Sequence, residues 1–281
     1  MPGILYVVAT PIGNLEDVTL RALRVLREVA LIAAEDTRRT AKLLARHAIP
    51  TPTTSLHEHN EAKKAPALLA RLAAGEDIAV VSDAGTPGVS DPGLKLVQAA
   101  IAAGIQVVPV PGPSAVLTAL VGSGLPFNDF TFVGFAPSKA RARREWLLGL
   151  KTENRPVVAF EAPHRVRAFL ADALDILGNR QIIVGRELTK VHEEWLRGSV
   201  EQVLARLVEP QGEFTVVLAP AAPAESSLAE PVTAERLYAE FCEMTENVGC
   251  SRRAAVSALA GRHSLSAREV YQAIEAHKKL V

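Results

Sequence analysis

Short apolar runs recur along the first 115 residues, and each is followed by a loop and then by a segment whose apolar positions have helical spacing. The runs lie at residues 4–8, 31–34, 77–81 and 106–110. Such β-branched, apolar runs predict buried strands, and the spaced segments, such as Thr19 to Ala30, predict helices. Because strands that alternate with helices favour βαβ units, residues 1–115 are predicted to form an α/β domain with a mostly parallel sheet.

The same alternation resumes after residue 116. Apolar runs lie at residues 130–134, 156–161, 181–185 and 214–218, and residues 193–199 have the pattern of a further strand. We therefore predict a second α/β domain over residues 116–220, with a mixed sheet. The Pro/Ala/Ser-rich segment at residues 221–232 is typical of a linker.

Residues 233–281 have the pattern of three short helices and predict a small helical bundle. The helices are expected at residues 234–243, 251–261 and 266–277, with Ser251 and Ser266 as N-caps and Glu269 completing a capping box. The bundle is rich in basic residues: Arg252, Arg253, Arg262, Arg268, Lys278 and Lys279. Nucleic-acid binding and an ordinary solvated helix face explain these residues equally well.

Composition limits the partners of the chain. Its 281 residues exceed the usual size of one core, and 48% hydrophobic with 22% charged residues argues against global disorder. The 31 basic and 31 acidic residues cancel, so attraction to a nucleic acid must come from local patches. Cys242 and Cys250 have no further ligands nearby, which predicts reduced, buried thiols and no metal site. The sequence has no run that resembles a signal peptide or a membrane span, so we expect a cytoplasmic protein without membrane contact.

The stretch from Val81 to Gly93 is the strongest candidate for a binding loop. It follows a predicted buried strand and precedes a predicted helix, and it reads VSDAGTPGVSDPG. Ligands of open α/β sheets bind at the carboxyl ends of strands, where Gly and Pro let main-chain groups approach a ligand closely. A plain surface connection would need fewer such residues than the five that surround Asp83 and Asp91.

Two further loops at predicted strand ends, residues 11–14 and 111–115, are likewise rich in Gly, Pro and small polar residues. Neither the GxGxxG of a dinucleotide-binding unit nor the GxxxxGK[ST] of a P-loop is present in the sequence, which disfavours NAD and ATP. Loops made of small residues and main-chain groups, with Asp83 among them, favour a nucleoside-like ligand with hydroxyl and amine groups over a polyphosphate.

Seven ordered strings give the chain a family resemblance. They are VATPIGNLEDVTLRAL (Val8 to Leu23), AAEDTRRTAKLL (Ala33 to Leu44), VSDAGTPGVSDPG (Val81 to Gly93), VPVPGPSA (Val108 to Ala115), FEAPHR (Phe160 to Arg165), RELTKVHEE (Arg186 to Glu194) and GEFTVV (Gly212 to Val217). From about Ile4 to Leu218 the chain resembles the small-subunit (16S) ribosomal RNA cytidine 2′-O-methyltransferases. These belong to the tetrapyrrole methylase, or class III methyltransferase, superfamily.

The resemblance implies a homodimeric enzyme that binds S-adenosyl-L-methionine between its two α/β domains. Its partner would be small-subunit ribosomal RNA or the ribosomal subunit, and it would methylate the ribose 2′-hydroxyl of a cytidine in the decoding region. Carried over by motif, the implied cofactor-binding residues are Pro11, Asp83, Ala84, Gly85, Thr86, Ser114, Ala115, Phe135, Ala136, Leu188, Thr189, Glu213, Phe214 and Thr215.

The sequence does not identify which residue takes the hydroxyl proton. The candidates are Glu161, His164 and Lys190, with Glu35, Asp36 and Glu187 as further possibilities. A carboxylate here could equally pair with Arg165 or Arg186 and only fix a loop. For RNA binding, the predicted residues are Arg38, Arg39, Lys139, Arg141, Arg143 and Arg144, although a solvated helix face explains most short charge runs.

Two rival functions fit parts of the pattern. One is a tetrapyrrole or other small-molecule methyltransferase on the same scaffold, which would methylate a soluble pigment precursor. It predicts an acidic or neutral cleft wall and would not need the basic run at Lys139 to Arg144 or the basic tail. The other is a non-catalytic RNA-binding or ribosome-assembly factor, which would bind no cofactor.

Overall fold

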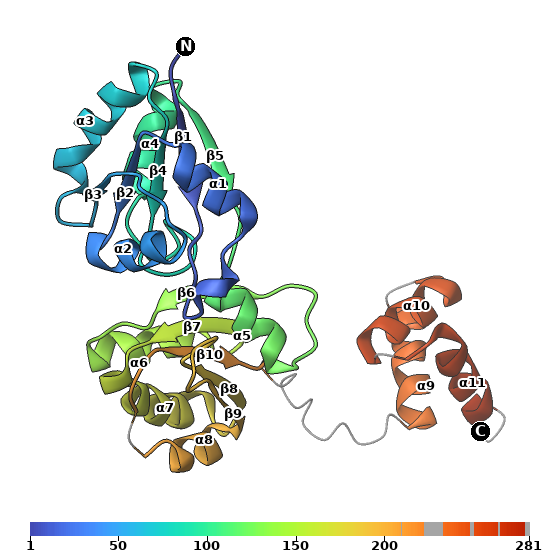
Figure 1. Ribbon diagram of the computed structural model, residues 1–281. Coiled ribbons are helices and arrows are strands. Elements are labelled where there is room, and N and C mark those ends of the chain that lie inside the picture. Colours follow the sequence, from blue (N-terminus) through green and yellow to red (C-terminus); the bar gives the residue numbers. More distant parts are fainter. Residues whose placement is uncertain (209, 222–232, 248–249, 264, 279–281) are drawn as a thin grey trace. The chain divides into compact units, whose positions relative to one another are not determined.

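The computed structural model describes residues 1–208, 210–221, 233–247, 250–263 and 265–278. The chain divides into two compact units, Met1–Ala222 and Pro223–Val281 (Figure 1). Apart from Ala221, the predicted linker at residues 221–232 lies outside the described residues.

The first lobe of the larger unit is a parallel five-stranded sheet with helices on both faces (Figure 1). The strands follow the order β3-β2-β4-β1-β5. They span Ile4–Val8 (β1), Leu31–Ala34 (β2), Thr53–Ser55 (β3), Ile78–Val81 (β4) and Gln106–Val110 (β5). The helices span Leu20–Glu28 (α1), Thr37–Arg46 (α2), Glu61–Ala73 (α3) and Leu94–Ala102 (α4), and a 3₁₀ turn at Leu15–Asp17 (η1) precedes α1.

Side chains of these strands divide the core of the first lobe into two layers. Leu31 and Ala33 join the layer with α3 and α4, whereas Ile32 and Ala34 join the layer with α1 and α2. Because successive residues of a strand point to opposite faces, a sheet covered on both faces needs apolar residues at every position. The loops after its parallel strands all leave from one edge of the sheet, which is where a ligand site is expected.

The second lobe is a mixed five-stranded sheet with the order β6-β7-β10-β8-β9. Only β6 and β7 are parallel, and the other neighbours are antiparallel. The strands span Thr131–Phe135 (β6), Val157–Glu161 (β7), Gln181–Arg186 (β8), Glu194–Ser199 (β9) and Phe214–Leu218 (β10). The helices span Ala115–Ser123 (α5), Ala140–Gly149 (α6), Pro163–Leu177 (α7) and Val200–Arg206 (α8).

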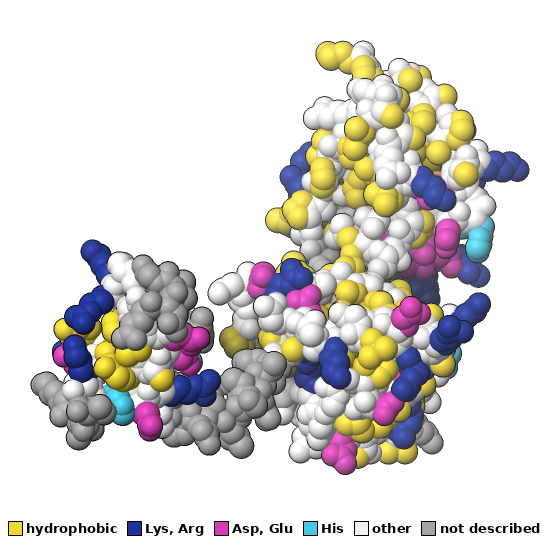
Figure 2. Space-filling view, turned by 180° about the vertical axis from the view of Figure 1, so that it is seen from behind, with side chains coloured by type: hydrophobic (Ala, Val, Ile, Leu, Met, Phe, Trp, Pro, Cys, Tyr) yellow, Lys and Arg dark blue, Asp and Glu magenta, His cyan; other side chains and the backbone are white. Residues whose placement is uncertain are grey.

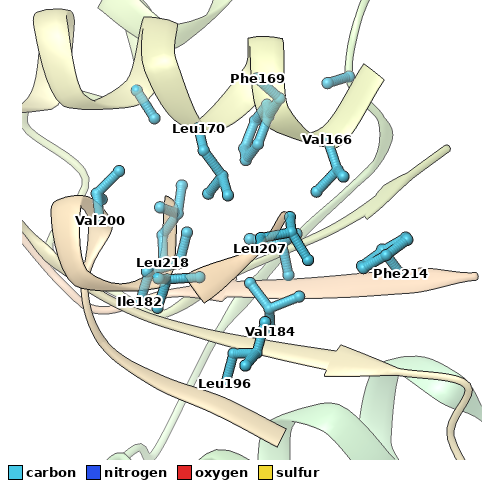
Figure 3. Packing of buried hydrophobic residues seen from close by; sticks show 14 of the residues in the cluster. Val166, Phe169, Leu170, Ile182, Val184, Leu196, Val200, Leu207, Phe214 and Leu218 are labelled. Atoms are coloured by element: carbon cyan, nitrogen blue, oxygen red, sulfur yellow. The ribbon is translucent and has the colours of Figure 1, made fainter. Parts of the chain in front are cut away.

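Different helices cover the two faces of the second sheet. Figure 3 shows Val166, Phe169 and Leu170 of α7 pointing at side chains of β8 and β10, in a core that α6 and α8 complete. On the opposite face α5 packs against β7, β8 and β10. The cluster around α5 also takes in Ile12 and Ala84 from loops of the first lobe, so one apolar cluster joins the two lobes.

The fold class predicted from the sequence is confirmed: a parallel α/β lobe, a mixed α/β lobe and a helical unit. The prediction missed α2 and β3. Helix α2 carries three buried residues among mostly polar ones, and β3 is only three residues long. The boundary between residues 115 and 116 stays a prediction, because both lobes belong to one compact unit.

The smaller unit contains three helices among the described residues, as predicted. They span Ala234–Cys242 (α9), Arg252–His263 (α10) and Ala267–Lys278 (α11), and the chain continues from α9 into a π-helical turn at Glu243–Asn247 (η2). Leu237, Leu259, Val270 and Ile274 form their common core.

Both expected N-caps of this unit are present. Ser251 Oγ accepts the amide of Ala254 at 3.3 Å, and Ser266 and Glu269 form the reciprocal capping box. Cys242 and Cys250 are free thiols, but they are half-buried, so the prediction of buried thiols is wrong; α9 to α11 leave both side chains partly accessible. Lys279 and the side chain of Arg262 lie outside the described residues. Among the helices that the structure describes, none has the length and hydropathy that crossing a bilayer requires.

Candidate functional site

A cavity of about 310 Å³ lies between the two lobes. From the first lobe it is lined by the loops after β1, β4 and β5, and from the second lobe by the ends of β6 and β7, the turn after β8 and the start of β10. The lining residues are Ile12, Ala84, Gly85, Thr86, Val89, Ser90, Asp91, Ser114, Ala115, Val116, Phe135, Phe160, Glu161, Ala162, Pro163, Leu188, Glu213, Phe214 and Thr215.

The loop after β4 is tied to β1 by main-chain hydrogen bonds. Thr10 and Gly85 form an antiparallel bridge, with N···O distances of 2.8 and 3.0 Å, and the hydroxyl of Thr10 donates to the carbonyl of Ser82 at 3.1 Å. Gly85 has φ +76°, a conformation that disfavours side chains. Glycine is therefore required where this loop turns along the cavity wall.

The loop after β1 approaches the second lobe closely. A Cβ atom on Gly13 would lie 2.7 Å from the carbonyl oxygen of Leu188, and the amide of Asn14 donates to Thr189 Oγ1 at 3.0 Å. Thr189 itself has φ +66°. Pro11 and Thr189 do not line the cavity, but the segments that contain them bring the two lobes together.

Acidic side chains gather behind the loop after β4. The amide of Asp36 donates to Asp83 Oδ1 at 3.0 Å, the amide of Asp83 donates to Glu35 Oε2 at 3.1 Å, and Arg39 pairs with Asp83 at 3.4 Å. Asp83 is thus held against the end of β2 and is not among the lining residues.

Asp91 is the acidic residue of this group that lines the cavity. Burial, followed by the charge of Glu35, raises the pKa of the Asp91 carboxyl to about 7, although a hydrogen bond from Ser82 opposes the shift. Burial likewise raises the pKa of Glu35. Asp91 can therefore exchange a proton near neutral pH inside the cavity.

Glu161 faces the cavity from the end of β7. Its residue surface is 3% exposed, and its Oε1 accepts the amide of Ala162 at 2.7 Å and pairs with Arg165 at 2.8 Å. Its Oε2 is buried without a hydrogen-bond partner. Buried carboxylate oxygens are nearly always hydrogen-bonded, so this atom marks a place where a ligand group can donate.

Two aromatic rings form the wall beside Glu161. The register of β6 shifts against β7 between Phe132 and Phe135, with Gly134 at φ +66°, and this bulge turns Phe135 toward the cavity. The rings of Phe135 and Phe160 are 5.4 Å apart, and Phe135 is 53% exposed. One face of this pair is available to a planar group.

Lys190 and His164 fit a proton acceptor less well. Lys190 Nζ lies 2.9 Å from both Glu187 Oε1 and Glu213 Oε2. Partial burial lowers the pKa of Lys190, but the hydrogen bonds to Glu187 and Glu213 outweigh it, so the net pKa is raised and the amine stays protonated. His164 is exposed and does not line the cavity.

Ten of the residues named for the cofactor do line the cavity: Ala84, Gly85, Thr86, Ser114, Ala115, Phe135, Leu188, Glu213, Phe214 and Thr215. Pro11, Asp83, Ala136 and Thr189 do not. The cavity is also lined by residues that were not predicted from the sequence: Ile12, Val89, Ser90, Asp91, Val116, Phe160, Ala162 and Pro163. Seven of these eight lie inside the quoted motifs and Val116 directly follows one, so carrying over every residue of each motif would have included all but Val116.

The basic residues of α6 face in different directions. Arg143 is 6% exposed and pairs with Asp172 of α7 at 2.7 Å, and Arg144 pairs with Asp172 at 2.9 Å and with Asp175. The expectation that Arg143 is free to contact RNA is therefore not supported, because its buried guanidinium already pairs with Asp172 of α7. Lys139 and Arg141 are exposed. Arg38 pairs with Asp36 at 2.7 Å and remains largely exposed, as does Arg39.

Comparison with known proteins gives consistent matches. A model of the family described as Tetrapyrrole (Corrin/Porphyrin) Methylases matches residues 4–204. The chain is 46% identical to "Ribosomal RNA small subunit methyltransferase I" of Synechocystis sp., over 96% of each chain. It is 41% identical to the protein of that name from Bacillus subtilis, over 96% of this chain and 94% of the other.

Solved structures share the fold at lower identity. The uroporphyrin-III C-methyltransferase of Thermus thermophilus, complexed with S-adenyl homocysteine, has a TM-score of 0.57 and 21% identity, over 77% of this chain and 97% of the other. A diphthine synthase has a TM-score of 0.58 and 14% identity, over 77% and 90%. These likenesses concern the fold alone, and the two proteins are named for different reactions.

Proposed function

We infer the function of this chain from its family: the chain belongs to the tetrapyrrole (corrin/porphyrin) methylases. We propose that it is an S-adenosylmethionine-dependent methyltransferase that acts on small-subunit ribosomal RNA. The observation that carries this proposal is the 46% identity, over 96% of both chains, to a protein named for that activity. The cavity supports it, because ten residues implied by the family motifs meet there.

The lining residues fit S-adenosylmethionine by charge and size. Asp91, Glu161 and Glu213 are acidic, and within the described part of the chain no Lys, Arg or His lines the cavity. This suits a cationic sulfonium nucleoside and disfavours a polyphosphate. The volume of about 310 Å³ is at the small end of ligand sites, which suits one nucleoside-sized molecule.

The loop after β4 and Ser114 would hold the cofactor from the first lobe, and the first turn of α5, Leu188 and Phe214 would hold it from the second. When bound, S-adenosylmethionine supplies a methyl group that is already activated for nucleophilic attack. The protein's contribution is therefore mainly to hold the acceptor oxygen in line, which can account for much of the acceleration.

We propose Asp91 as the proton acceptor and Glu161 as a positioning residue. A general base works best when its pKa is near the working pH, and Asp91 meets this condition, with a pKa of about 7. Asp91 would take the hydroxyl proton while the acceptor oxygen gains the methyl group. Glu161, held by Arg165, would use Oε2 to accept a hydrogen bond from the ligand that occupies the cavity.

For the acceptor, we propose the ribose 2′-hydroxyl of a cytidine in the decoding region, as the seven motifs imply. The exposed face of Phe135 supports a role in holding an unstacked base, because single-stranded RNA is recognised by stacking on aromatic side chains. Lys139, Arg141, Arg38 and Arg39 are the exposed cations we propose for the RNA backbone. Figure 2 shows Lys and Arg side chains interspersed with Asp and Glu, in line with the balanced composition.

We further propose a cytoplasmic homodimer. Its support is an apolar surface on α5, where Leu117 is 53% and Val121 is 72% exposed, one helical turn apart. Large exposed apolar side chains that share one helix face are typical of an interface.

The test is to incubate the pure chain with methyl-labelled S-adenosylmethionine and small ribosomal subunits and to map the label to a nucleotide. We expect one labelled 2′-O-methylcytidine in the small-subunit RNA. A tetrapyrrole precursor serves as the alternative acceptor, and labelling of that compound alone would overturn the proposal. Lack of cofactor binding in a titration would instead favour a non-catalytic RNA-binding factor.

A further inference from the structure

The helical unit has a groove of its own, which the proposed function does not use. It has a volume of about 920 Å³ and lies among α9, α10 and α11. Its lining residues are Tyr238, Phe241, Cys242, Thr245, Arg252, Arg253, Val256, Ser257, Ala267, Arg268, Tyr271, Ile274, Glu275 and Lys278.

Aromatic side chains from two helices contribute to the groove. Tyr238 and Phe241 come from α9 and are half-buried on the core of the unit, and Tyr271 comes from α11 and is 57% exposed. The ring of Tyr238 also contacts that of His277, with 5.2 Å between the ring centroids. These rings offer a planar ligand apolar faces at the groove wall.

The rim of the groove is basic. Arg252 and Arg253 lie in the first turn of α10, and Arg268 and Lys278 lie in α11. Among the lining residues that the structure describes, Glu275 is the only acidic one. All four cations are exposed, and within the described ranges none of them pairs with a carboxylate. By contrast, Arg236 on α9 pairs with Glu240 at 3.2 Å.

The basic and apolar side chains lie next to one another. On the face of the helical unit visible in Figure 2, hydrophobic side chains lie beside Lys and Arg side chains, with some Asp and Glu among them. Structures that bind single-stranded nucleic acid combine these two features: cations follow the phosphates and aromatic rings stack on the bases.

We propose that this groove binds a single-stranded segment of RNA. The proposal rests on the proposed function only for the identity of that RNA, which would be small-subunit ribosomal RNA. The cations would also attract an acidic peptide. Carboxylate side chains cannot stack on the exposed ring of Tyr271, whereas every nucleic-acid base has a flat face that can. RNA held there stays tethered to the unit that carries the cavity, which raises the effective concentration of RNA for methylation.

The test measures RNA binding by the full chain without cofactor. The probe is a fluorescent single-stranded RNA of about 16 nucleotides, followed by anisotropy over a range of salt concentrations. One variant combines Arg252→Ala, Arg253→Ala and Arg268→Ala. Its charge-matched control combines Arg24→Ala, Arg46→Ala and Arg236→Ala, which are exposed and lie outside the groove and the cavity. Tyr271→Ala and Tyr271→Phe test stacking separately.

We expect the groove variant to bind on the order of tenfold more weakly than the control, with a log–log salt slope smaller by about 2. Tyr271→Ala should weaken binding about fivefold, and Tyr271→Phe should restore it. Equal affinity and slope for the groove variant and its control would overturn the proposal. So would equal RNA affinity combined with a selective loss of binding to intact subunits, which would indicate a ribosomal protein in the groove.

Methyl transfer by the wild-type chain to small subunits is measured in parallel. If transfer fails while the groove variant still loses RNA affinity, the proposed function is wrong and the groove proposal stands. If transfer succeeds while the groove variant matches its control, the groove proposal alone is wrong.

Discussion

Arg165 reaches only one of the two carboxylate oxygens of Glu161: Nη2 lies 2.8 Å from Oε1, while Oε2 and Arg165 Nε are both buried without a partner. The pair is therefore incompletely hydrogen-bonded next to the cavity. A ligand donor at Oε2 would complete the hydrogen bonding of the carboxylate, which is a reason to expect ligand binding to stabilise this corner of the fold.

Arg165→Met should destabilise the protein by about 3 kcal/mol, because it leaves the buried carboxylate of Glu161 without its counter-charge. Urea unfolding measures the change. The double variant with Glu161→Gln should regain part of this loss, because no unpaired charge then remains. A double variant less stable than the single one would contradict the pairing.

The methyl-transfer rate at low substrate should rise with pH through about 7 and then level off, because only ionised Asp91 can accept a proton. Asp91→Asn should lower the rate by about 10²-fold or more and remove this step. Glu35→Gln is the matched variant, because it removes a charge that raises the pKa of Asp91. The midpoint of the pH–rate profile should therefore move to lower pH, while the rate at high pH stays unchanged. A midpoint that does not move would argue against Asp91.

The same carboxylate should lower the stability of the fold at neutral pH. Its pKa is higher in the folded state than the ordinary 3.8, so the native state binds more protons than the unfolded state between pH 3.8 and about 7. Stability from this group is therefore present at low pH and is lost as the pH rises through that window. Asp91→Asn should raise the melting temperature at pH 8 and leave it nearly unchanged below pH 4. Equal shifts at both pH values would show that burial of Asp91 is not the cause.

Two positions on α6 should separate stability from RNA binding. Arg143→Met breaks the buried pair with Asp172 and should cost about 3 kcal/mol of unfolding free energy, with no change in the salt dependence of RNA binding. Arg141→Ala should do the reverse: stability within about 0.5 kcal/mol of the wild type, and a salt slope smaller by about 0.7. Urea unfolding and RNA titration of the same samples check both. A change in the salt slope of RNA binding in Arg143→Met would show that Arg143 does contact RNA.

Gly13→Ala should weaken cofactor binding and destabilise the fold by about 1–3 kcal/mol, because the new methyl group would lie 2.7 Å from the carbonyl oxygen of Leu188. Gly149→Ala on α6 is the control, since its Cβ would meet open space and alanine is the better helix former. Calorimetric titration with S-adenosylmethionine and urea unfolding give the two readouts. Equal behaviour of both variants would refute the close approach of the two lobes at this point.

The sequence allowed the strands and the binding loops to be located because apolar runs such as 78–81 are buried on both faces and end in loops rich in Gly and Pro. It did not reveal that Arg143 and Asp172 are partners, because two residues 29 positions apart carry no mutual signal until α6 packs on α7. Nor did it single out Asp91, whose pKa depends on burial and on Glu35, a residue from a different strand end. Local periodicity predicts elements, whereas charge pairing and proton affinity depend on how those elements pack.

The cluster that includes Ile12, Ala84, Leu120 and Val217 also bears on how a ligand enters. If the lobes swung apart about a hinge, these side chains would be exposed to water, at a cost of about 25 cal/mol for each square ångström of apolar surface. Wide opening is therefore disfavoured, and exchange of cofactor and product is expected to proceed through the mouth of the cleft by small local motions. Turnover would then depend more on the loop after β4 and on Phe135 than on rigid-body movement of the lobes.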